Sequence, residues 1–273
     1  MDKRRGWRGR VWALFCAMAV VTAPGLAGAQ APAASPPDAR GVLRGMFEFL
    51  AMAKHFSVTA KGSYDAVQAS GQKIEWNEVR TITISRPDRL RMEGERSNGA
   101  RSLVVFDGKE ISTFDESGQV YAQAPQPGGV DESLVYFVRD LGMRLPLAAL
   151  FISRAPAEMD RRVKSVEYVE KTGIFGALAY HIAGRTNTGV DFQLWIADGD
   201  RPVPLRAVLT YPTAPGQPQF RAEFSSWNLA ADPPDSFFTF TPPADATRIP
   251  FLIALQQVPP GKARASAKKG GKQ

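Results

Sequence analysis

The sequence predicts an α+β protein in which a single long antiparallel β-sheet curls into an unclosed barrel, with an N-terminal helix and a central helical insert on its concave side. Three observations lead to this prediction. Five short runs rich in β-branched and aromatic residues lie between residues 74 and 124, Asn98-Gly99 and Asp107-Gly108 each separate a neighbouring pair, and similar runs resume after residue 165. Asn-Gly and Asp-Gly favour the positive φ angles of tight hairpins, so consecutive runs should pair antiparallel.

Residues 1–29 have the pattern of a secretion signal. A basic head within residues 3–10 precedes an apolar stretch at residues 11–21, and Ala27-Gly28-Ala29 supplies the small residues of a cleavage site. The apolar stretch is shorter than the ~20 residues that span a bilayer, which argues against an uncleaved anchor. Cys16, the only cysteine, follows the bulky Phe15, so lipidation is not expected. We therefore expect a soluble periplasmic protein whose mature chain has no thiol and no disulfide.

The net charge of +7 does not describe the folded body. The signal accounts for +4 of it and the residues after Gly261 for +5, which leaves −2 for the rest of the chain. A nearly neutral body with a basic end lacks the electrostatic footprint of a nucleic-acid-binding domain. No nucleic-acid partner is therefore expected.

The chain is expected to form one domain at residues 39–250, after a flexible Ala/Pro/Ser-rich linker at residues 30–38. Asp38 can cap a helix whose apolar residues recur at helical spacing as far as Leu50. Strict alternation at residues 56–66 then predicts a half-buried strand. Residues 251–273 are predicted to be a basic, mostly disordered tail, which either contacts an anionic membrane surface or has no partner and only aids solubility.

Helical spacing returns in the middle of the chain. Acidic residues at 131 and 132 suit a helix start, apolar residues follow at helical spacing up to Leu141, and further apolar stretches reach residue 163. This insert is more apolar than a surface excursion requires, so we expect it to pack on the concave side of the sheet as a lid or plug. Strand patterns resume at residues 165–171, 177–185, 190–197, 203–211 and 219–227.

One strand of the first sheet half contains a local conflict. Ile74, Trp76, Ile82 and Ile84 share a face, yet Glu78 and Arg80 fall between them on that same face. Either a β-bulge flips the register or the strand end projects into water, or the pair lies inside a cavity and contacts a polar head group.

No signature of catalysis, metal binding or cofactor binding is visible in the sequence. His55 and His181 have no partner at ligand spacing, and neither a nucleophile elbow nor a phosphate-binding glycine loop occurs. Acids such as Asp107 and Asp115 lie in turns, where carboxylates cap backbone N–H groups. We therefore expect no enzyme, no metal and no cofactor, although a carboxylate pair distant in sequence would escape this reasoning.

Apolar and aromatic residues on the predicted strands and insert are the candidate ligand contacts. Core packing is the alternative explanation for most of them, but an incompletely filled concave face would use the same residues to line an acyl-chain pocket. The predicted hydrophobic cavity is lined by Trp76, Ile82, Phe106, Tyr121, Leu134, Phe137, Phe151, Phe192, Trp195 and Phe224, with Glu78 and Arg80 as its polar contacts.

Several short motifs together resemble a family of predicted periplasmic proteins that carries a domain-of-unknown-function label. These are RPDRLR at residues 86–91, FDGKEI at 106–111, WIADGDRP at 195–202, FSSWNL at 224–229 and FTFTPP at 238–243. The order of the first motifs also resembles the Lol-type (LolA/LolB-like) lipoprotein carriers. That resemblance implies a half-barrel with helices across its mouth that holds the acyl chains of lipoproteins.

The function expected from these features is non-catalytic. We expect a periplasmic binding or carrier protein for a lipid, a lipoprotein or another hydrophobic ligand, held in the concave face of the sheet. The alternative is an envelope sensor or scaffold domain of the same fold that binds a protein partner. A hydrolase with a catalytic pair that the sequence does not reveal is the third possibility.

Overall fold

The computed structural model describes residues 36–143, 145–173 and 175–251. The predicted signal at residues 1–29, most of the linker, and all but the first residue of the predicted tail lie outside the described residues. None of the described helices is long and apolar enough to cross a membrane.

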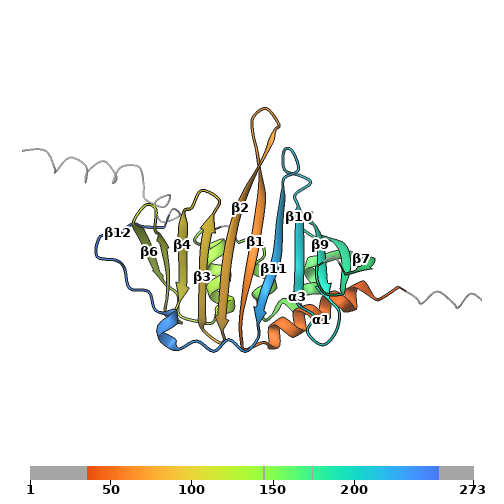
Figure 1. Ribbon diagram of the computed structural model, residues 1–273, viewed down its shortest axis with the longest axis horizontal. Helices are drawn as coiled ribbons and strands as arrows, with labels where there is room; N and C mark the ends of the chain where they lie inside the picture. Colours follow the sequence, from red (N-terminus) through yellow and green to blue (C-terminus); the bar gives the residue numbers. More distant parts are fainter. Residues whose placement is uncertain (1–35, 144, 174, 252–273) are drawn as a thin grey trace, which may run out of the picture. The chain divides into compact units, whose positions relative to one another are not determined.

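One open sheet of twelve strands dominates the described part of the chain, as the sequence predicted (Figure 1). The strand order is β12-β6-β5-β4-β3-β2-β1-β11-β10-β9-β8-β7. Neighbours pair antiparallel, except that the short β12 pairs parallel to β6 at one edge. The strands are β1 (His55–Val67), β2 (Lys73–Ser85), β3 (Arg89–Arg96), β4 (Arg101–Phe106), β5 (Glu110–Asp115), β6 (Val120–Pro125), β7 (Val163–Thr172), β8 (Ala179–Thr186), β9 (Asp191–Ala197), β10 (Pro204–Thr210), β11 (Gln219–Asn228) and β12 (Thr247–Arg248).

The sheet consists of two meanders that meet at its centre. Strands β1–β6 follow one another on one side, strands β7–β11 on the other, and β1 pairs with β11 to join them. The chain therefore leaves the sheet after β6, forms the helical insert, and re-enters at the far edge with β7. This route places the insert across the face that both meanders share.

The helices lie on one face of the sheet (Figure 1). They are α1 (Ala39–Met52), α2 (Val130–Arg139), α3 (Ala155–Arg162) and the short 3₁₀ turn η1 (Ala148–Phe151), and the predicted N-terminal helix and central insert are thereby confirmed. The carboxylate of Asp38 accepts a hydrogen bond from the Arg40 N–H at 3.0 Å and caps α1. The helix buries Leu43, Met46 and Leu50, which recur at helical spacing.

The hydrophobic core lies between these helices and the sheet. Alternation within each strand places one set of side chains toward the helices, and cross-strand pairs such as Phe56 with Ile84 are fully buried there. Phe56 also stacks against Phe151 of η1, with ring centroids 6.0 Å apart. We call this side the helix-covered face and the opposite side the helix-free face.

The helix-free face is covered over β3–β6 by the C-terminal segment, residues 232–251. Its 3₁₀ turn η2 (Asp235–Phe238) buries Phe238, and the backbone carbonyl of Phe237 accepts a hydrogen bond from Arg91 at 3.0 Å. Phe240 packs against Phe114 and Tyr121, with centroid distances of 6.0 and 5.8 Å. The segment ends at the sheet edge, where β12 pairs with β6.

Candidate functional site

Glu78 and Arg80 form an ion pair on the helix-covered face. Arg80 Nε lies 2.9 Å from Glu78 Oε1, and Arg80 Nη2 donates to Glu78 Oε2 at 2.9 Å, which is the two-bond geometry of a strong arginine–carboxylate pair. The side chains are 13% and 27% exposed, so both are largely removed from water. Strand β2 pairs with β1 and β3 without any register shift, so the β-bulge considered for this strand is wrong.

The end of β2 beyond this pair projects into water, as the second alternative for this strand predicted. Trp76 is 44% exposed, and its neighbours on the same face, Ile74 and Tyr64, are nearly as exposed. They belong to the β1–β2 hairpin that rises above the rest of the sheet in Figure 1. The helix-covered face thus has two parts, one under the helices and one open to solvent, with the ion pair between them.

The space between the ion pair and the insert is small. It measures about 30 Å³ and is lined by Ala60, Gly62, Glu78, Arg80, Ile82, Leu145, Pro146, Leu147, Phe151, Phe220, Ala222 and Phe224. That is room for a water molecule or two, whereas ligand pockets begin at roughly 300 Å³. At this point the helix-covered face is closed, because side chains of the chain's own insert fill the space.

The predicted cavity residues fall into four groups. Ile82, Phe151 and Phe224 line this small cavity together with Glu78 and Arg80. A second group, Phe106, Leu134, Phe137 and Phe192, lies buried on the same face in the hydrophobic core, as the packing alternative anticipated. Trp76 lies on this face but beyond the helices.

Tyr121 and Trp195 lie on the helix-free face, so their placement in the cavity was wrong. Tyr121 packs on Phe240, while Trp195 stacks on the buried His181 ring with centroids 4.0 Å apart. The reason is strand alternation, because the alanines beside Tyr121 and Leu194 beside Trp195 take the inward positions. Aromatic character alone did not reveal the face.

Small inward residues are the feature that sequence reasoning missed. Gly62 and Ala222 face each other across β1 and β11, and their small size leaves space where the small cavity meets the sheet. A Cβ on Gly62 would meet Glu78 and Phe220 only at 3.5 Å, an ordinary contact distance. Their position in the alternating pattern of two predicted strands was the available signal.

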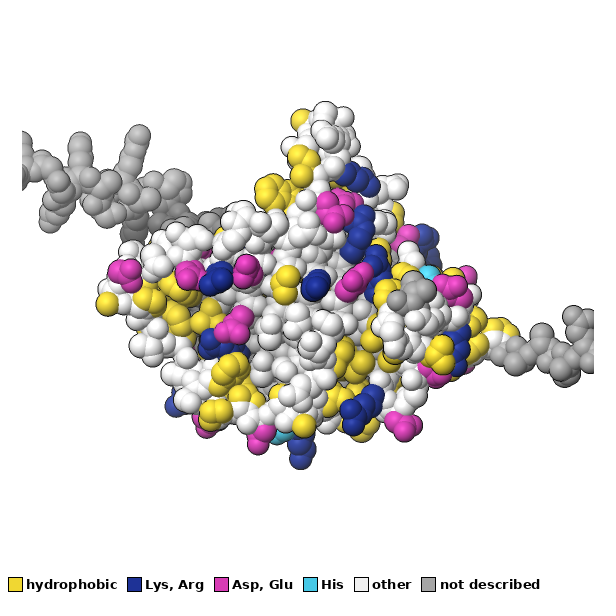
Figure 2. Space-filling model, in the orientation of Figure 1, with side chains coloured by type: hydrophobic (Ala, Val, Ile, Leu, Met, Phe, Trp, Pro, Cys, Tyr) yellow, Lys and Arg dark blue, Asp and Glu magenta, His cyan; other side chains and the backbone are white. Residues whose placement is uncertain are grey.

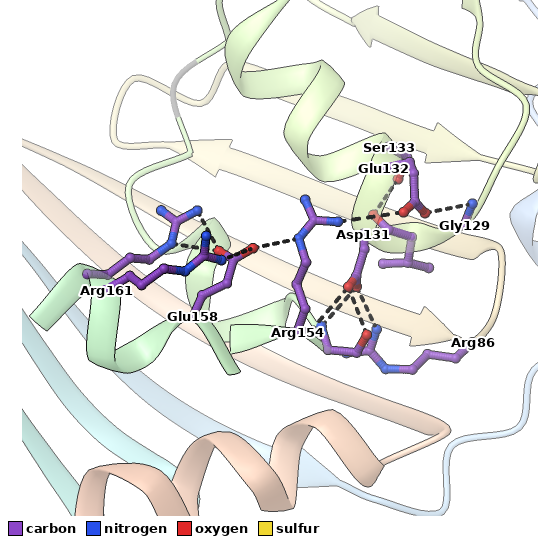
Figure 3. A network of polar contacts seen from close by, with 11 residues as sticks. Arg86, Gly129, Asp131, Glu132, Ser133, Arg154, Glu158 and Arg161 are labelled. Carbon is purple, nitrogen blue, oxygen red and sulfur yellow. Dashed lines mark hydrogen bonds and ion pairs between the residues drawn. The ribbon is translucent and has the colours of Figure 1, made fainter. Parts of the chain in front are cut away.

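A buried polar cluster fixes the insert to the sheet (Figure 3). Arg86, at the end of β2, donates to the carbonyl of Phe151 at 2.7 Å and to that of Ala53 at 3.2 Å, and its Nη1 lies 3.3 Å from Asp131 Oδ1. Asp131, in the first turn of α2, also accepts hydrogen bonds from the backbone N–H and the hydroxyl of Ser153 at 2.9 and 2.8 Å. We call Arg86, Asp131 and Ser153 the insert clamp.

Arg86 and Asp131 form the charged pair of the clamp, and both side chains are largely removed from solvent. The Arg86 and Asp131 side chains are each 12% exposed. Burial lowers the pKa of Arg86, and the nearby Asp131 carboxylate partly opposes this shift. Arginine stays protonated in proteins, so Arg86 keeps its charge at neutral pH. Sequence reasoning did not find it, because the partners lie 45 residues apart.

A large hollow lies on the helix-free face and is bordered by charged side chains of both signs. It measures about 1290 Å³ and is bordered by strands β1–β5, β10 and β11. Charged side chains of both signs cross this face in a band (Figure 2). Strand register places them in one cross-strand row, which reads Arg101, Glu95, Val79, Lys61, Glu223, Arg206, Trp195, His181 and Glu170.

The acids predicted to shape turns do so where the structure describes their contacts. Asp107 accepts hydrogen bonds from the backbone N–H groups of Lys109 and Glu110, both at 2.9 Å, and Asp115 accepts one from Gly118 at 2.9 Å. Within residues 36–251, apart from positions 144 and 174, no cluster of three metal-ligating side chains is present.

The fold and its faces define an α+β protein with an open, helix-covered sheet. The chain belongs to the family described as "Predicted periplasmic protein (DUF2092)", whose model matches residues 39–252. This confirms the resemblance to a predicted periplasmic family and places the protein in the periplasm. No curated protein sequence matches the chain.

Solved structures with a similar fold are distant in sequence. An uncharacterized conserved protein from Thermus thermophilus is 13% identical (TM-score 0.42; 78% of this chain and 98% of that chain covered). The lipoprotein LppX from Mycobacterium tuberculosis is 15% identical (TM-score 0.42; 71% and 96%). A LolA superfamily protein from Nitrosomonas europaea is also 15% identical (TM-score 0.34; 75% and 98%).

Proposed function

We propose that the protein is a non-catalytic periplasmic binding protein that holds the apolar chain of a lipid, a lipoprotein or another hydrophobic ligand on the helix-covered face. The observation that supports this proposal is the open half of that face, where exposed Trp76 and its apolar neighbours lead down to the Glu78–Arg80 pair and the small cavity below it. A ligand would lie along this surface with its chain under the insert and its polar head at the ion pair.

Entry requires that the insert give way, and the energetics permit it. Burying an acyl chain of about ten methylenes is worth ~8 kcal/mol, whereas re-exposing the two leucines that cover the cavity, Leu145 and Leu147, costs roughly 3–6 kcal/mol. The part of the insert over the cavity is an irregular stretch followed by the one-turn η1, and the clamp holds the insert at Asp131, at the Phe151 carbonyl and at Ser153, but not at the leucines. The leucines can therefore be displaced without breaking the clamp.

The test is native mass spectrometry of the full chain exported with its own signal, together with titration of the neutral apolar fluorophore N-phenyl-1-naphthylamine. We expect an apolar ligand to accompany the protein, and the fluorophore to bind. Leu147→Glu, which puts a carboxylate over the cavity at a half-buried position, should weaken fluorophore binding at least tenfold, by about 1.4 kcal/mol. Leu178→Glu, an equally drastic change at an exposed leucine in the β7–β8 loop, should not. If the protein carries no ligand and binds no fluorophore, the proposal is wrong.

A second candidate is an envelope sensor or scaffold that binds a protein partner. The 1290 Å³ hollow on the helix-free face favours it, because mixed charges and an exposed Val79 suit a wet protein interface. Lys61 lies at the centre of the charge row and makes no ion pair among the described residues. For this function, Lys61→Glu should abolish co-purification of the partner while Leu147→Glu leaves it unchanged.

A further inference from the structure

Polar side chains of three strands meet on the open half of the helix-covered face, next to the Glu78–Arg80 pair. Strand register sets Arg80 opposite Gly94, and Gly94 opposite Ser102. Gly94 has no side chain, and both neighbours lean into the space that it leaves. A Cβ at Gly94 would lie 2.9 Å from Ser102 Oγ and 3.8 Å from Arg80 Cγ. The guanidinium-bearing chain and the hydroxyl therefore flank a gap in the side-chain layer.

A second arginine adjoins this gap. Arg96 lies directly opposite Glu78 across β2 and β3, on the same face by strand alternation. Glu78 is already engaged by Arg80 with two bonds, and Arg96 makes no ion pair with any described residue. Its side chain is exposed at the end of β3. The cluster of Arg80, Arg96, Glu78 and Ser102 thus contains two cations and one anion.

The neighbouring charges do not cancel this excess. Asp115 faces Ser102 across β4 and β5, but its carboxylate accepts a hydrogen bond from the Gly118 N–H in the turn, and it lies three strands from Arg80, or ~14 Å at the usual strand spacing. That distance exceeds the screening length of about 10 Å at 0.1 M salt. On the other side, the inward residues of β1 and β11 next to the pair are uncharged: Ala60, Gly62, Ala222 and Phe224.

We propose that this cluster selects ligands whose apolar chain carries an anionic phosphate or carboxylate head, an inference that rests on the proposed binding of an apolar chain under the insert. The head replaces the Glu78 carboxylate on the fork of Arg80 and accepts further hydrogen bonds from Arg96 and Ser102. A guanidinium fork fits carboxylate and phosphate oxygens equally well, so both head groups belong to the class. In the ligand-free protein, Glu78 holds Arg80 in place next to the apolar lining of the small cavity.

The test compares ligands that share one chain and differ in the head. Dodecyl phosphate, dodecanoate, dodecanol and dodecyltrimethylammonium each compete with the neutral fluorophore for the full-length mature protein. We expect both anions to bind about tenfold or more tightly than the alcohol, and the ammonium compound to bind most weakly. The difference between phosphate and carboxylate shows which head the site prefers. Equal binding of alcohol and anions would overturn the inference and leave the proposed function standing.

Variants separate the cluster from general surface charge. Arg80→Gln and Arg96→Gln should each reduce the anion preference several-fold, whereas Glu78→Gln should preserve or increase it because Arg80 is released. Arg101→Gln is the matched control, since Arg101 pairs with Glu95 on the opposite face of the sheet. Should Arg80→Gln impair folding, the double variant Glu78→Gln/Arg80→Gln removes both charges and must also lose the preference. A loss of equal size in Arg101→Gln contradicts the inference, and failure of every probe, the alcohol included, overturns the proposed function as well.

Discussion

Asp65 is the most deeply buried carboxylate in the ion pairs of the described residues. Its side chain is 5% exposed, its Oδ1 lies 2.9 Å from Arg221 Nη1, and its Oδ2 accepts from the Gln219 N–H at 2.9 Å. Burial alone would raise the pKa of Asp65, but the hydrogen bonds from Arg221 and Gln219, with the charges of Arg221 and Lys73, lower it below its ordinary value of 3.8. The carboxylate fastens β1 to β11, the junction of the two meanders.

Asp65→Asn should destabilise the protein at neutral pH by about 2 kcal/mol, the cost of losing charged hydrogen bonds at a buried site. A lowered folded-state pKa gives stability that is present above pH 3.8 and is lost as the pH falls through the folded value. The difference between wild type and variant should therefore narrow below pH 4. Urea unfolding at pH 7 and at pH 3 measures it.

Asp191→Asn is the control for this prediction. Asp191 pairs with Arg185 at 2.5 Å, and its pKa is also lowered by the Arg185 hydrogen bond, but the Asp191 side chain is 35% exposed and that of Arg185 is 54% exposed. An exposed pair contributes less than ~1 kcal/mol because water and salt screen it. A pH-independent effect of Asp65→Asn, or an equal effect of Asp191→Asn, would contradict the assignment.

At the residue scale, sequence alternation predicted Glu78 and Arg80 correctly as neighbours on the face of Ile82. Strand alternation could also have predicted the faces of Tyr121 and Trp195. Their faces were predicted wrongly because aromatic character was given more weight than position in the strand. The clamp could not be predicted from the sequence. The RPDRLR motif was recognised, but no sequence pattern near Arg86 indicates that it contacts Asp131.

At the scale of elements, the insert depends on the clamp for its position. Asp131→Ala leaves the guanidinium of Arg86 buried with only carbonyl partners, and breaking such a pair costs about 3 kcal/mol or more. We expect a lower urea midpoint and faster amide exchange across residues 130–162, measured by hydrogen exchange with mass spectrometry. The looser insert should also admit the neutral fluorophore faster.

Arg154→Gln provides the comparison for the clamp. Arg154 contacts Glu132 at 3.6 Å and Glu158 at 3.0 Å in the same network (Figure 3), but it is 41% exposed. Its loss should cost less than ~1 kcal/mol and leave exchange in the insert nearly unchanged. If Asp131→Ala behaves like Arg154→Gln, the clamp does not hold the insert.

Helical spacing was sufficient to predict α1 and α2, and runs of β-branched and aromatic residues between turn signals predicted most of the strands. These are local patterns, and each element's apolar stripe determines which side is buried. The occupancy of the helix-covered face was not predictable in this way. Whether Leu147 and Phe151 fill a cavity depends on where the insert crosses the sheet, which small inward residues such as Gly62 and Ala222 help to decide.

On the scale of the whole molecule, the sheet depends on one long-range pairing. Antiparallel hairpins account for each meander, and a continuous sheet was predicted, but the pairing of β1 with β11 joins strands at opposite ends of the domain. No turn signal specifies such a contact. The charge row on the helix-free face continues across this junction, where Lys61 lies opposite Glu223.

The C-terminal segment completes this architecture, because it covers the helix-free side of β3–β6 that would otherwise expose apolar side chains. Phe238 is fully buried there, so Phe238→Ala should cost about 3–5 kcal/mol, measured by urea unfolding. Two truncations separate the segment from the basic tail. A chain ending at Phe251 should unfold at the wild-type midpoint, since the tail is predicted to contribute no packing. A chain ending at Leu229 loses η2, Phe240 and β12 and should be strongly destabilised; equal stability of the two truncated chains would show that the segment does not hold the sheet.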